Sequence, residues 1–302
     1  MAVSTPLRYP GGKSVMTPFL EEFILVNNMQ NVVYAEPYSG GAGAALNLLF
    51  QKSVDSIIIN DASIPVYSFW ESITNFSGRF MYFFENTPIT IPEWERQRDI
   101  FVTHNTKFSV ELGFATFFLN RCNRSGILKA GVIGGNSMEK QETAKYKIDA
   151  RFNKDLLRER LQKIIENRER IAIKNLDALV FLEQCSNLSI DEKQNLLIYL
   201  DPPYYIHGAE LYMNSYQHED HIALSNSLRD LDIIRWILSY DNVPAIKQLY
   251  CDEYDLYTFD LKYTVQGAKT GKELLCHSQN SILPFNLEIT RASGAIPLIP
   301  IL

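Results

Sequence analysis

An Asp-Pro-Pro-Tyr motif follows the most apolar strand-length run of the chain. Asp201, Pro202, Pro203 and Tyr204 come directly after Leu196–Leu200, at the carboxyl edge where open α/β sheets bind their ligands. The prolines fix the backbone and direct the Pro202 carbonyl at one spot. The Asp201 carboxylate and this carbonyl can accept both hydrogens of an aromatic amine and orient its nitrogen for methyl transfer. Tyr204 is predicted to stack on an extruded base. A strand-ending Asp-Pro turn is the alternative.

A second ligand-binding pattern lies near the N-terminus. A strand-like run at 32–36 leads into a turn with Gly40, Gly41 and Gly43, where glycine lets the backbone approach a ligand at a helix N-terminus. The third glycine of a dinucleotide fingerprint is absent, yet Asp61 lies 20 residues after Gly41, where a ribose-binding acid is expected. This spacing does not separate a nicotinamide dinucleotide from S-adenosylmethionine, and a helix N-cap is the alternative for Asp61.

The segments around these motifs alternate between strand-like and helix-like patterns, which is typical of a doubly wound α/β sheet. The predicted strands are 32–36, 56–60, 171–174, 196–200 and 234–239, with a late hairpin of 256–263 and 273–277. Residues 73–170 lose this alternation and become rich in aromatic, asparagine and basic residues. We therefore expect a catalytic domain of residues 1–72 and 171–302, interrupted by an inserted domain of residues 73–170.

Basic charge is concentrated in the middle of an acidic chain. The net charge is −6, but residues 121–174 hold 14 Lys and Arg against 7 Asp and Glu. The remaining residues hold 15 against 28. Such a block is typical of phosphate contacts, and a solvated basic helix is the alternative.

Several motifs together resemble the DNA adenine methylase family, in its alpha group of amino-methyltransferases. They are Leu7-Arg8-Tyr9-Pro10-Gly11-Gly12-Lys13, Glu36-Pro37-Tyr38-Ser39-Gly40-Gly41-Ala42-Gly43, Asn60-Asp61 and Asp201-Pro202-Pro203-Tyr204. The similarity also takes in other stretches, including Gly271-Lys272-Glu273-Leu274-Leu275, and spans nearly the whole chain. One departure is Ala42, where many relatives have glycine. The resemblance implies a Rossmann-like S-adenosylmethionine-dependent sheet with an inserted, mainly helical target-recognition domain.

The resemblance also implies cofactor-binding residues. They are Tyr9, Gly12, Lys13, Glu36, Pro37, Tyr38, Gly40, Asp61 and Asp177. Lys13 would neutralise the methionine carboxylate or a nearby acid, and Glu36 to Gly40 would surround the methionine part. Asp61 would hold the ribose hydroxyls, and Asp177 would accept from the adenine amine of the cofactor.

The function that the resemblance implies is site-specific methylation of adenine N6 in double-stranded DNA. The predicted DNA contacts are Asn120, Arg121, Asn123 and Arg124. Helix C-capping and surface solvation ahead of Gly126 are the alternative for these four residues. Other functions consistent with the motifs are methylation of cytosine amino groups or of RNA, non-catalytic DNA binding, and nicotinamide-dependent oxidation. A solitary methylase and the protective half of a restriction system, with a cognate restriction endonuclease as partner, both stay open.

The cysteines and histidines predict no metal site. Four cysteines are scattered without CxxC pairs, which disfavours zinc and disulfides and favours a cytoplasmic location. Among the five histidines, only His218 and His221 have ligand-like spacing, and we predict that this pair lies on a polar helix surface. No run approaches the roughly 20 apolar residues of a membrane span, and no signal peptide is expected before Leu7.

Overall fold

An eight-stranded sheet forms the centre of the fold. The computed structural model describes residues 4–9, 11–206, 216–263, 269–284, 288–291 and 294–301, so Pro10 and His207 lie outside the described residues. The strand order is β10-β6-β7-β5-β4-β1-β2-β3, and β8 and β9 form a separate pair. The strands are β1 (Val33–Glu36), β2 (Ser56–Asn60), β3 (Ile171–Lys174), β4 (Leu196–Leu200), β5 (Arg235–Asp241), β6 (Tyr257–Tyr263), β7 (Lys269–His277), β8 (Glu288–Arg291), β9 (Gly294–Pro297) and β10 (Ile299–Pro300).

The order of the strands changes direction between β1 and β4. From β1 the order runs outward to β2 and β3 on one side, and through β4 to β5 on the other, all in parallel. The strands β7 and β6 then add an antiparallel hairpin at β5. A switch point of this kind leaves a crevice at the carboxyl ends of the two central strands. The architecture confirms the predicted α/β class.

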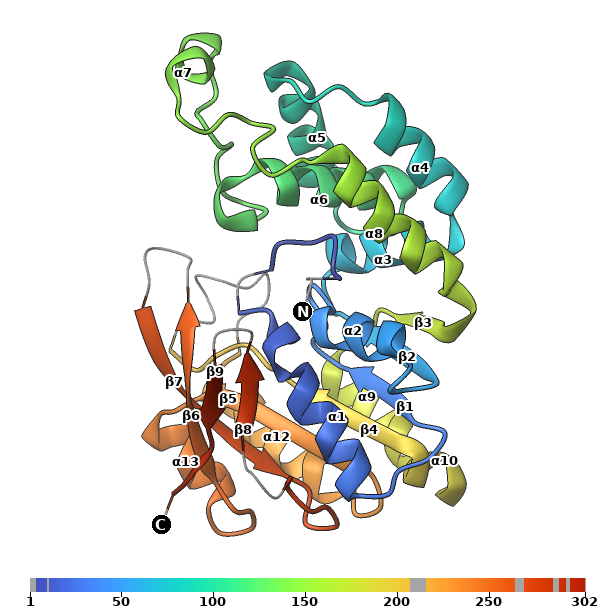
Figure 1. The fold of residues 1–302 in the computed structure, drawn as a ribbon, viewed down its shortest axis with the longest axis vertical. Helices are drawn as coiled ribbons and strands as arrows, with labels where there is room; N and C mark the ends of the chain where they lie inside the picture. Colours follow the sequence, from blue (N-terminus) through green and yellow to red (C-terminus); the bar gives the residue numbers. More distant parts are fainter. Residues whose placement is uncertain are drawn as a thin grey trace.

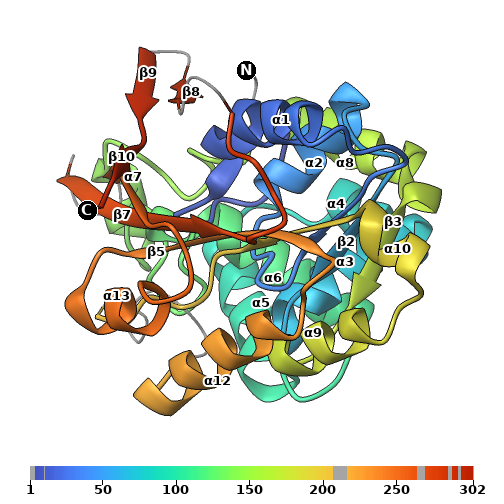
Figure 2. The same cartoon turned by 90° about the horizontal axis from the view of Figure 1, so that it is seen from below.

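Helices cover both faces of the sheet, as Figure 2 shows. The helices α1 (Thr17–Val26) and α2 (Gly43–Gln51) lie on one face, and α9 (Ala178–Ser186), α12 (His218–Arg229) and α13 (Pro244–Tyr250) lie on the other. The short α10 (Ile190–Asn195) precedes β4. Alternate side chains of β4 enter two separate apolar cores, with Leu197 and Tyr199 in one and Ile198 and Leu200 in the other. Burial on both faces explains why β4 reads as a continuous apolar run.

A helical region lies beyond one edge of the sheet, at the top of Figure 1. It comprises α3 (Ile64–Asn75), α4 (Ser77–Asn86), α5 (Ile91–Thr103), α6 (Val110–Cys122), α7 (Met138–Thr143) and α8 (Lys154–Glu166), all between β2 and β3. Its centre is aromatic, with stacked pairs Phe69–Phe117 and Phe84–Phe152. These rings belong to the same apolar core as the face of the sheet covered by α1 and α2. The predicted boundary at residue 72 falls inside α3.

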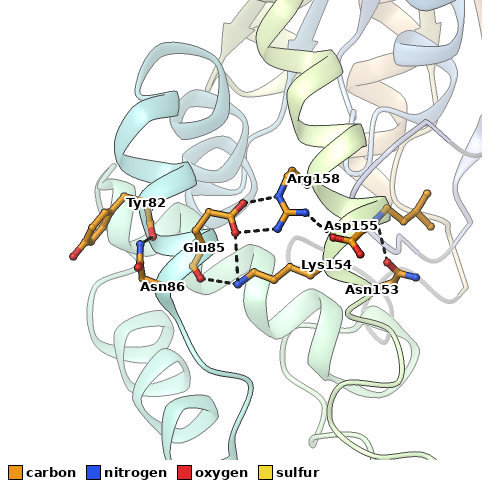
Figure 3. A network of polar contacts seen from close by, with 8 residues as sticks. Tyr82, Glu85, Asn86, Asn153, Lys154, Asp155 and Arg158 are labelled. Atoms are coloured by element: carbon orange, nitrogen blue, oxygen red, sulfur yellow. Dashed lines mark hydrogen bonds and ion pairs between the residues drawn. The ribbon is translucent and has the colours of Figure 1, made fainter.

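Polar contacts between α4 and α8 add to this packing at the surface (Figure 3). Arg158 donates to both carboxylate oxygens of Glu85, at 2.7 and 3.0 Å. Lys154 donates to the Glu85 backbone carbonyl at 2.6 Å, and Asp155 accepts from Arg158 at 2.7 Å. Because these groups are exposed, solvent screens their charges and the aromatic core provides most of the cohesion.

Candidate functional site

The glycine turn after β1 is held by three surrounding side chains. Gly40 has φ +46°, and a Cβ there would lie 2.5 Å from the Tyr9 ring. The Gly40 N–H donates to Asp61 at 2.9 Å, and the Trp70 indole donates to the Gly40 carbonyl at 2.9 Å. Ala42 adopts φ +46°, so this departure from the family pattern occupies a left-handed position usually taken by glycine. Only glycine fits at residue 40 without displacing Tyr9.

Asp61 connects the end of β2 to the turn. One carboxylate oxygen accepts from the Gly40 N–H and the other accepts from the Ser63 N–H at 2.9 Å. Ser63, and not Asp61, is the N-cap residue of α3. Burial raises the pKa of Asp61 to about 6, although both backbone hydrogen bonds act to lower it. A carboxylate has about four lone-pair positions, so two bonds leave Asp61 able to accept from a ligand diol.

Glu36 ends β1 and is buried beneath the turn. Its Oε1 accepts from the Tyr34 hydroxyl at 3.0 Å and from the Ala45 N–H at 3.0 Å. Burial raises the pKa of Glu36 to about 8, although these two hydrogen bonds act to lower it. The side chain is therefore ready to ionise when a cation approaches.

Asp201 directly follows β4, beside the end of β1. Its Oδ1 accepts from Lys13 Nζ at 2.8 Å and from the Ser239 hydroxyl at 3.4 Å. Burial raises the pKa of Asp201 to about 6; Lys13 lowers it and Glu273 raises it. Lys13 was predicted to neutralise either the cofactor carboxylate or a nearby acid. In the structure it pairs with an acid of the protein, Asp201. Tyr204 also contacts Lys13, which donates to its hydroxyl at 2.8 Å.

One cavity of about 620 Å³ joins these groups, a volume typical of small-molecule sites. All nine predicted cofactor residues line it, together with Asp201 and Pro203 of the proline motif. Asp177 is exposed at the N-terminus of α9, where it accepts from the Leu179 N–H at 2.9 Å. Pro202 and Tyr204 are buried, and Tyr204 lies in the hydrogen-bond network behind Asp201.

Two of the four predicted DNA contacts are internal amides. The Asn120 side chain accepts from the Arg8 N–H at 2.7 Å and donates to the Arg8 and Gly126 carbonyls. The Asn123 side chain accepts from the Trp94 indole at 2.7 Å and donates to the carbonyls of residues 127 and 128. Both residues are almost fully buried, so here they hold the end of α6 and the N-terminal segment in place.

The two predicted arginine contacts have different positions. Arg121 is buried, donates to the Arg151 and Pro6 carbonyls, and lines the cavity. Arg124 is exposed. Arg8 and Arg160, which motif analysis did not select, line the cavity beside Arg121.

The prediction of a polar surface for the pair His218 and His221 is wrong for His221. Its side chain is only 1% exposed, and its Nδ1 lies 2.5 Å from the Tyr240 hydroxyl. Position four of α12 turns toward the sheet and packs this imidazole against Tyr205 and Tyr216. Within the described ranges, no group of three His, Cys, Asp or Glu side chains is arranged to hold a metal ion. Likewise, none of the described helices is long and apolar enough to cross a bilayer.

Glu273 is the site residue that motif analysis missed. It lies on β7, is 1% exposed, and approaches Lys13 Nζ to 3.5 Å. It also accepts a hydrogen bond from the Tyr204 hydroxyl. An isolated acid before the apolar residues Leu274 and Leu275 was the available signal, because a charge in a buried strand requires a partner.

Comparisons with known proteins identify a family over most of the chain. Residues 9–265 match the sequence model of the family described as D12 class N6 adenine-specific DNA methyltransferase. No curated protein matches the chain significantly.

Similar solved structures are distant. A candidate RNA methyltransferase from Pyrococcus horikoshii is 7% identical with a TM-score of 0.39, covering 90% of this chain and 83% of that chain. The rRNA methyltransferase aviRa from Streptomyces viridochromogenes is 12% identical with a TM-score of 0.38, covering 88% and 84%. Likeness at this level says nothing about the substrate of the present chain.

Proposed function

The chain belongs to the family of D12 class N6 adenine-specific DNA methyltransferases, and we propose that it methylates the N6 amine of an adenine extruded from duplex DNA. The observation that supports this most strongly is the convergence of the Asp201 carboxylate and all nine predicted cofactor residues on one cavity. The cavity opens at the switch point between β1 and β4, where open sheets bind ligands.

The cavity groups fit S-adenosylmethionine, which supplies an electrophilic methyl group when bound. Glu36 is a buried carboxylate that ionises readily beside a cation, so it would hold the methionine ammonium. Asp61 retains lone pairs for the ribose hydroxyls. Asp177, exposed at the far end of the lining, would accept from the adenine amine. Lys13 is occupied by Asp201 and Glu273, so we assign it to the catalytic carboxylate.

Asp201 is proposed to accept one hydrogen of the target amine, and the Pro202 carbonyl the other. These two bonds pull electron density toward the nitrogen and hold its lone pair in line for transfer. As the nitrogen forms its new bond, the amine becomes acidic and Asp201 is placed to take its proton. Stacking of the base on Tyr204 stays a prediction of the sequence, because here the Tyr204 ring is buried and its hydroxyl is bonded to Lys13 and Glu273.

The cation cluster beside the cavity supports a nucleic-acid substrate. Arg8, Arg121 and Arg160 contact backbone carbonyls, and no carboxylate of the described residues stabilises their charges. Burial, followed by repulsion from Arg8 and Arg160, lowers the pKa of Arg121 to about 9. A buried guanidinium without a counter-charge, such as that of Arg121, is costly, and a bound phosphate would stabilise its charge.

We propose residues 73–170 as the recognition region and Arg124 as the exposed DNA contact. Asn120 and Asn123 would act indirectly, by shaping the base of this region. The cytoplasmic location and the restriction-endonuclease partner stay predictions of the sequence.

Transfer of labelled methyl groups tests the proposal. Wild-type protein is given S-adenosylmethionine with either duplex DNA or RNA of matched sequence, beside Asp201→Ala and the exposed control Asp191→Ala. We expect transfer to DNA by wild type and control, and a loss of about 10³-fold or more for Asp201→Ala.

Calorimetry supplies the control for folding. Asp201→Ala leaves Lys13 paired with Glu273, so its affinity for S-adenosylmethionine should stay near wild type. Transfer to RNA alone, label in methylcytosine, or near-normal turnover by Asp201→Ala would each overturn the proposal.

A further inference from the structure

Asp201 and Glu273 come from different strands of the sheet and approach the same lysine, Lys13. Asp201 follows the parallel strand β4, whereas Glu273 lies in the antiparallel strand β7, opposite Asp241 of β5. Lys13 Nζ is 2.8 Å from Asp201 Oδ1 and 3.5 Å from Glu273 Oε1. The lysine and glutamate side chains are 4% and 1% exposed, and that of Asp201 is 16% exposed. Two carboxylates thus share a single buried ammonium.

All three hydrogens of this ammonium are used. Lys13 donates to the Gly11 carbonyl at 3.3 Å, to Asp201 at 2.8 Å and to the Tyr204 hydroxyl at 2.8 Å. An ammonium has three donors, so its position is fully specified. The Tyr204 hydroxyl accepts from Lys13 and donates to Glu273. Glu273 therefore fixes both Tyr204 and, by charge, Lys13.

We infer that Glu273 is a positioning residue for methyl transfer, which draws the charge of Lys13 partly away from Asp201 and so preserves Asp201 as a strong acceptor for the target amine. The inference rests on the proposed function. Without Glu273, Asp201 would pair with the whole charge of Lys13, and the negative charge on its carboxylate oxygen would be largely neutralised. A second buried carboxylate prevents this neutralisation while the lysine still holds Asp201 in place.

The electrostatics of the site agree with this geometry. Burial is the main cause that raises the pKa of Asp201 to about 6, Lys13 opposes it, and Glu273 raises it further. The pKa of Lys13 is raised, because the two carboxylates outweigh the effect of its burial. The other titratable groups whose charges interact with Asp201 are Tyr9, Tyr34, Glu36, Tyr199 and Tyr240. Glu273 also interacts with Tyr199.

The test is the pH dependence of single-turnover methyl transfer from pH 5 to 8.5. Glu273→Gln removes the charge but keeps an oxygen that can accept from Tyr204. We expect the midpoint of the acidic limb to fall by roughly one pH unit, because Asp201 then has Lys13 to itself. The plateau rate should fall by up to about tenfold, because a less basic Asp201 takes the proton less readily. Affinities for DNA and cofactor should stay unchanged.

Two further variants complete the experiment. Lys272→Gln changes an exposed charge on the same strand, and its profile should superimpose on wild type. Glu273→Asp keeps the charge and should retain the wild-type midpoint, which a purely structural role would not require. If Glu273→Gln does not fold, Glu273→Met removes the same charge and should show the same shift.

The outcomes separate the two claims. An active Glu273→Gln or Glu273→Met protein with the wild-type acidic midpoint overturns the role of Glu273. A wild-type protein that makes no methyladenine instead overturns the proposed function.

Discussion

Replacing Lys13 by methionine tests whether the site depends on one buried cation. Methionine keeps much of the side-chain length but removes the charge and all three hydrogen bonds to Gly11, Asp201 and Tyr204. Asp201 and Glu273 then remain in the interior without a counter-charge. Breaking a buried pair by removing one partner costs about 3–5 kcal/mol. Because Asp201 keeps slight exposure, we expect a loss near the lower end, about 3 kcal/mol at pH 8.

The pH dependence of this loss has a definite sign. In Lys13→Met, the folded protein holds Asp201 at a higher pKa than the unfolded chain, so folding takes up protons. Stability linked to such groups is present at low pH and is lost as pH rises through the folded pKa. The wild-type pKa of Asp201 is already about 6 with Lys13 present. The penalty should therefore be largest at pH 8 and shrink markedly by pH 5.5.

Urea unfolding at pH 8 and pH 5.5 measures this effect. The double variant Lys13→Met with Glu273→Gln removes one of the two uncompensated charges and should recover part of the loss at pH 8. A loss equal at both pH values would refute the charge argument and leave only packing. No loss at either pH would show that Lys13 does not balance these carboxylates.

Three other predictions concern the cofactor turn and the recognition region. S-adenosylmethionine affinity should increase about tenfold for each unit by which pH rises toward 8, because Glu36, whose pKa is raised to about 8, must ionise to hold an ammonium. Calorimetry of Glu36→Gln should show an affinity that does not change over this pH range. Gly40→Ala should weaken cofactor binding and lower stability by about 2 kcal/mol or more through its φ and the Tyr9 contact, whereas thermal melts of the control Gly78→Ala, which has open space, should show no loss. Arg124→Glu should weaken DNA binding and reduce its salt slope by about one, and Lys193→Glu on α10 should leave the slope unchanged; an unchanged slope for Arg124→Glu would remove this residue from the interface.

Local patterns were sufficient to predict the sheet and the strand-end motifs. The apolar run before Asp201 and the turn before Gly43 are continuous in sequence, so propensity and spacing place them. Every predicted strand appears, with β1, β5 and β6 starting one residue later than expected. Parallel strands then bring Glu36, Asp61 and Asp201 to one edge without further information.

Contacts between distant residues escaped the sequence patterns. Tyr204 bonds Glu273 across 69 residues, and Asn120 bonds Arg8 across 112 residues. The residues next to each of them in sequence do not indicate which distant residue it bonds. Asn120 was therefore predicted to contact DNA, although its amide is internal. His221 shows the same difficulty, because the face of α12 that is buried depends on Tyr240 of strand β5, 19 residues away.

The central claim is that this chain methylates adenine in DNA, and nucleoside analysis of the modified product tests it most directly. Unmethylated duplex DNA is incubated with the wild-type protein and labelled S-adenosylmethionine, digested to nucleosides, and mapped for the modified positions. The account predicts label in N6-methyladenine alone, at one short recurring sequence, with none from Asp201→Ala. Label in N4-methylcytosine, or none on DNA from a protein that binds the cofactor, would contradict it.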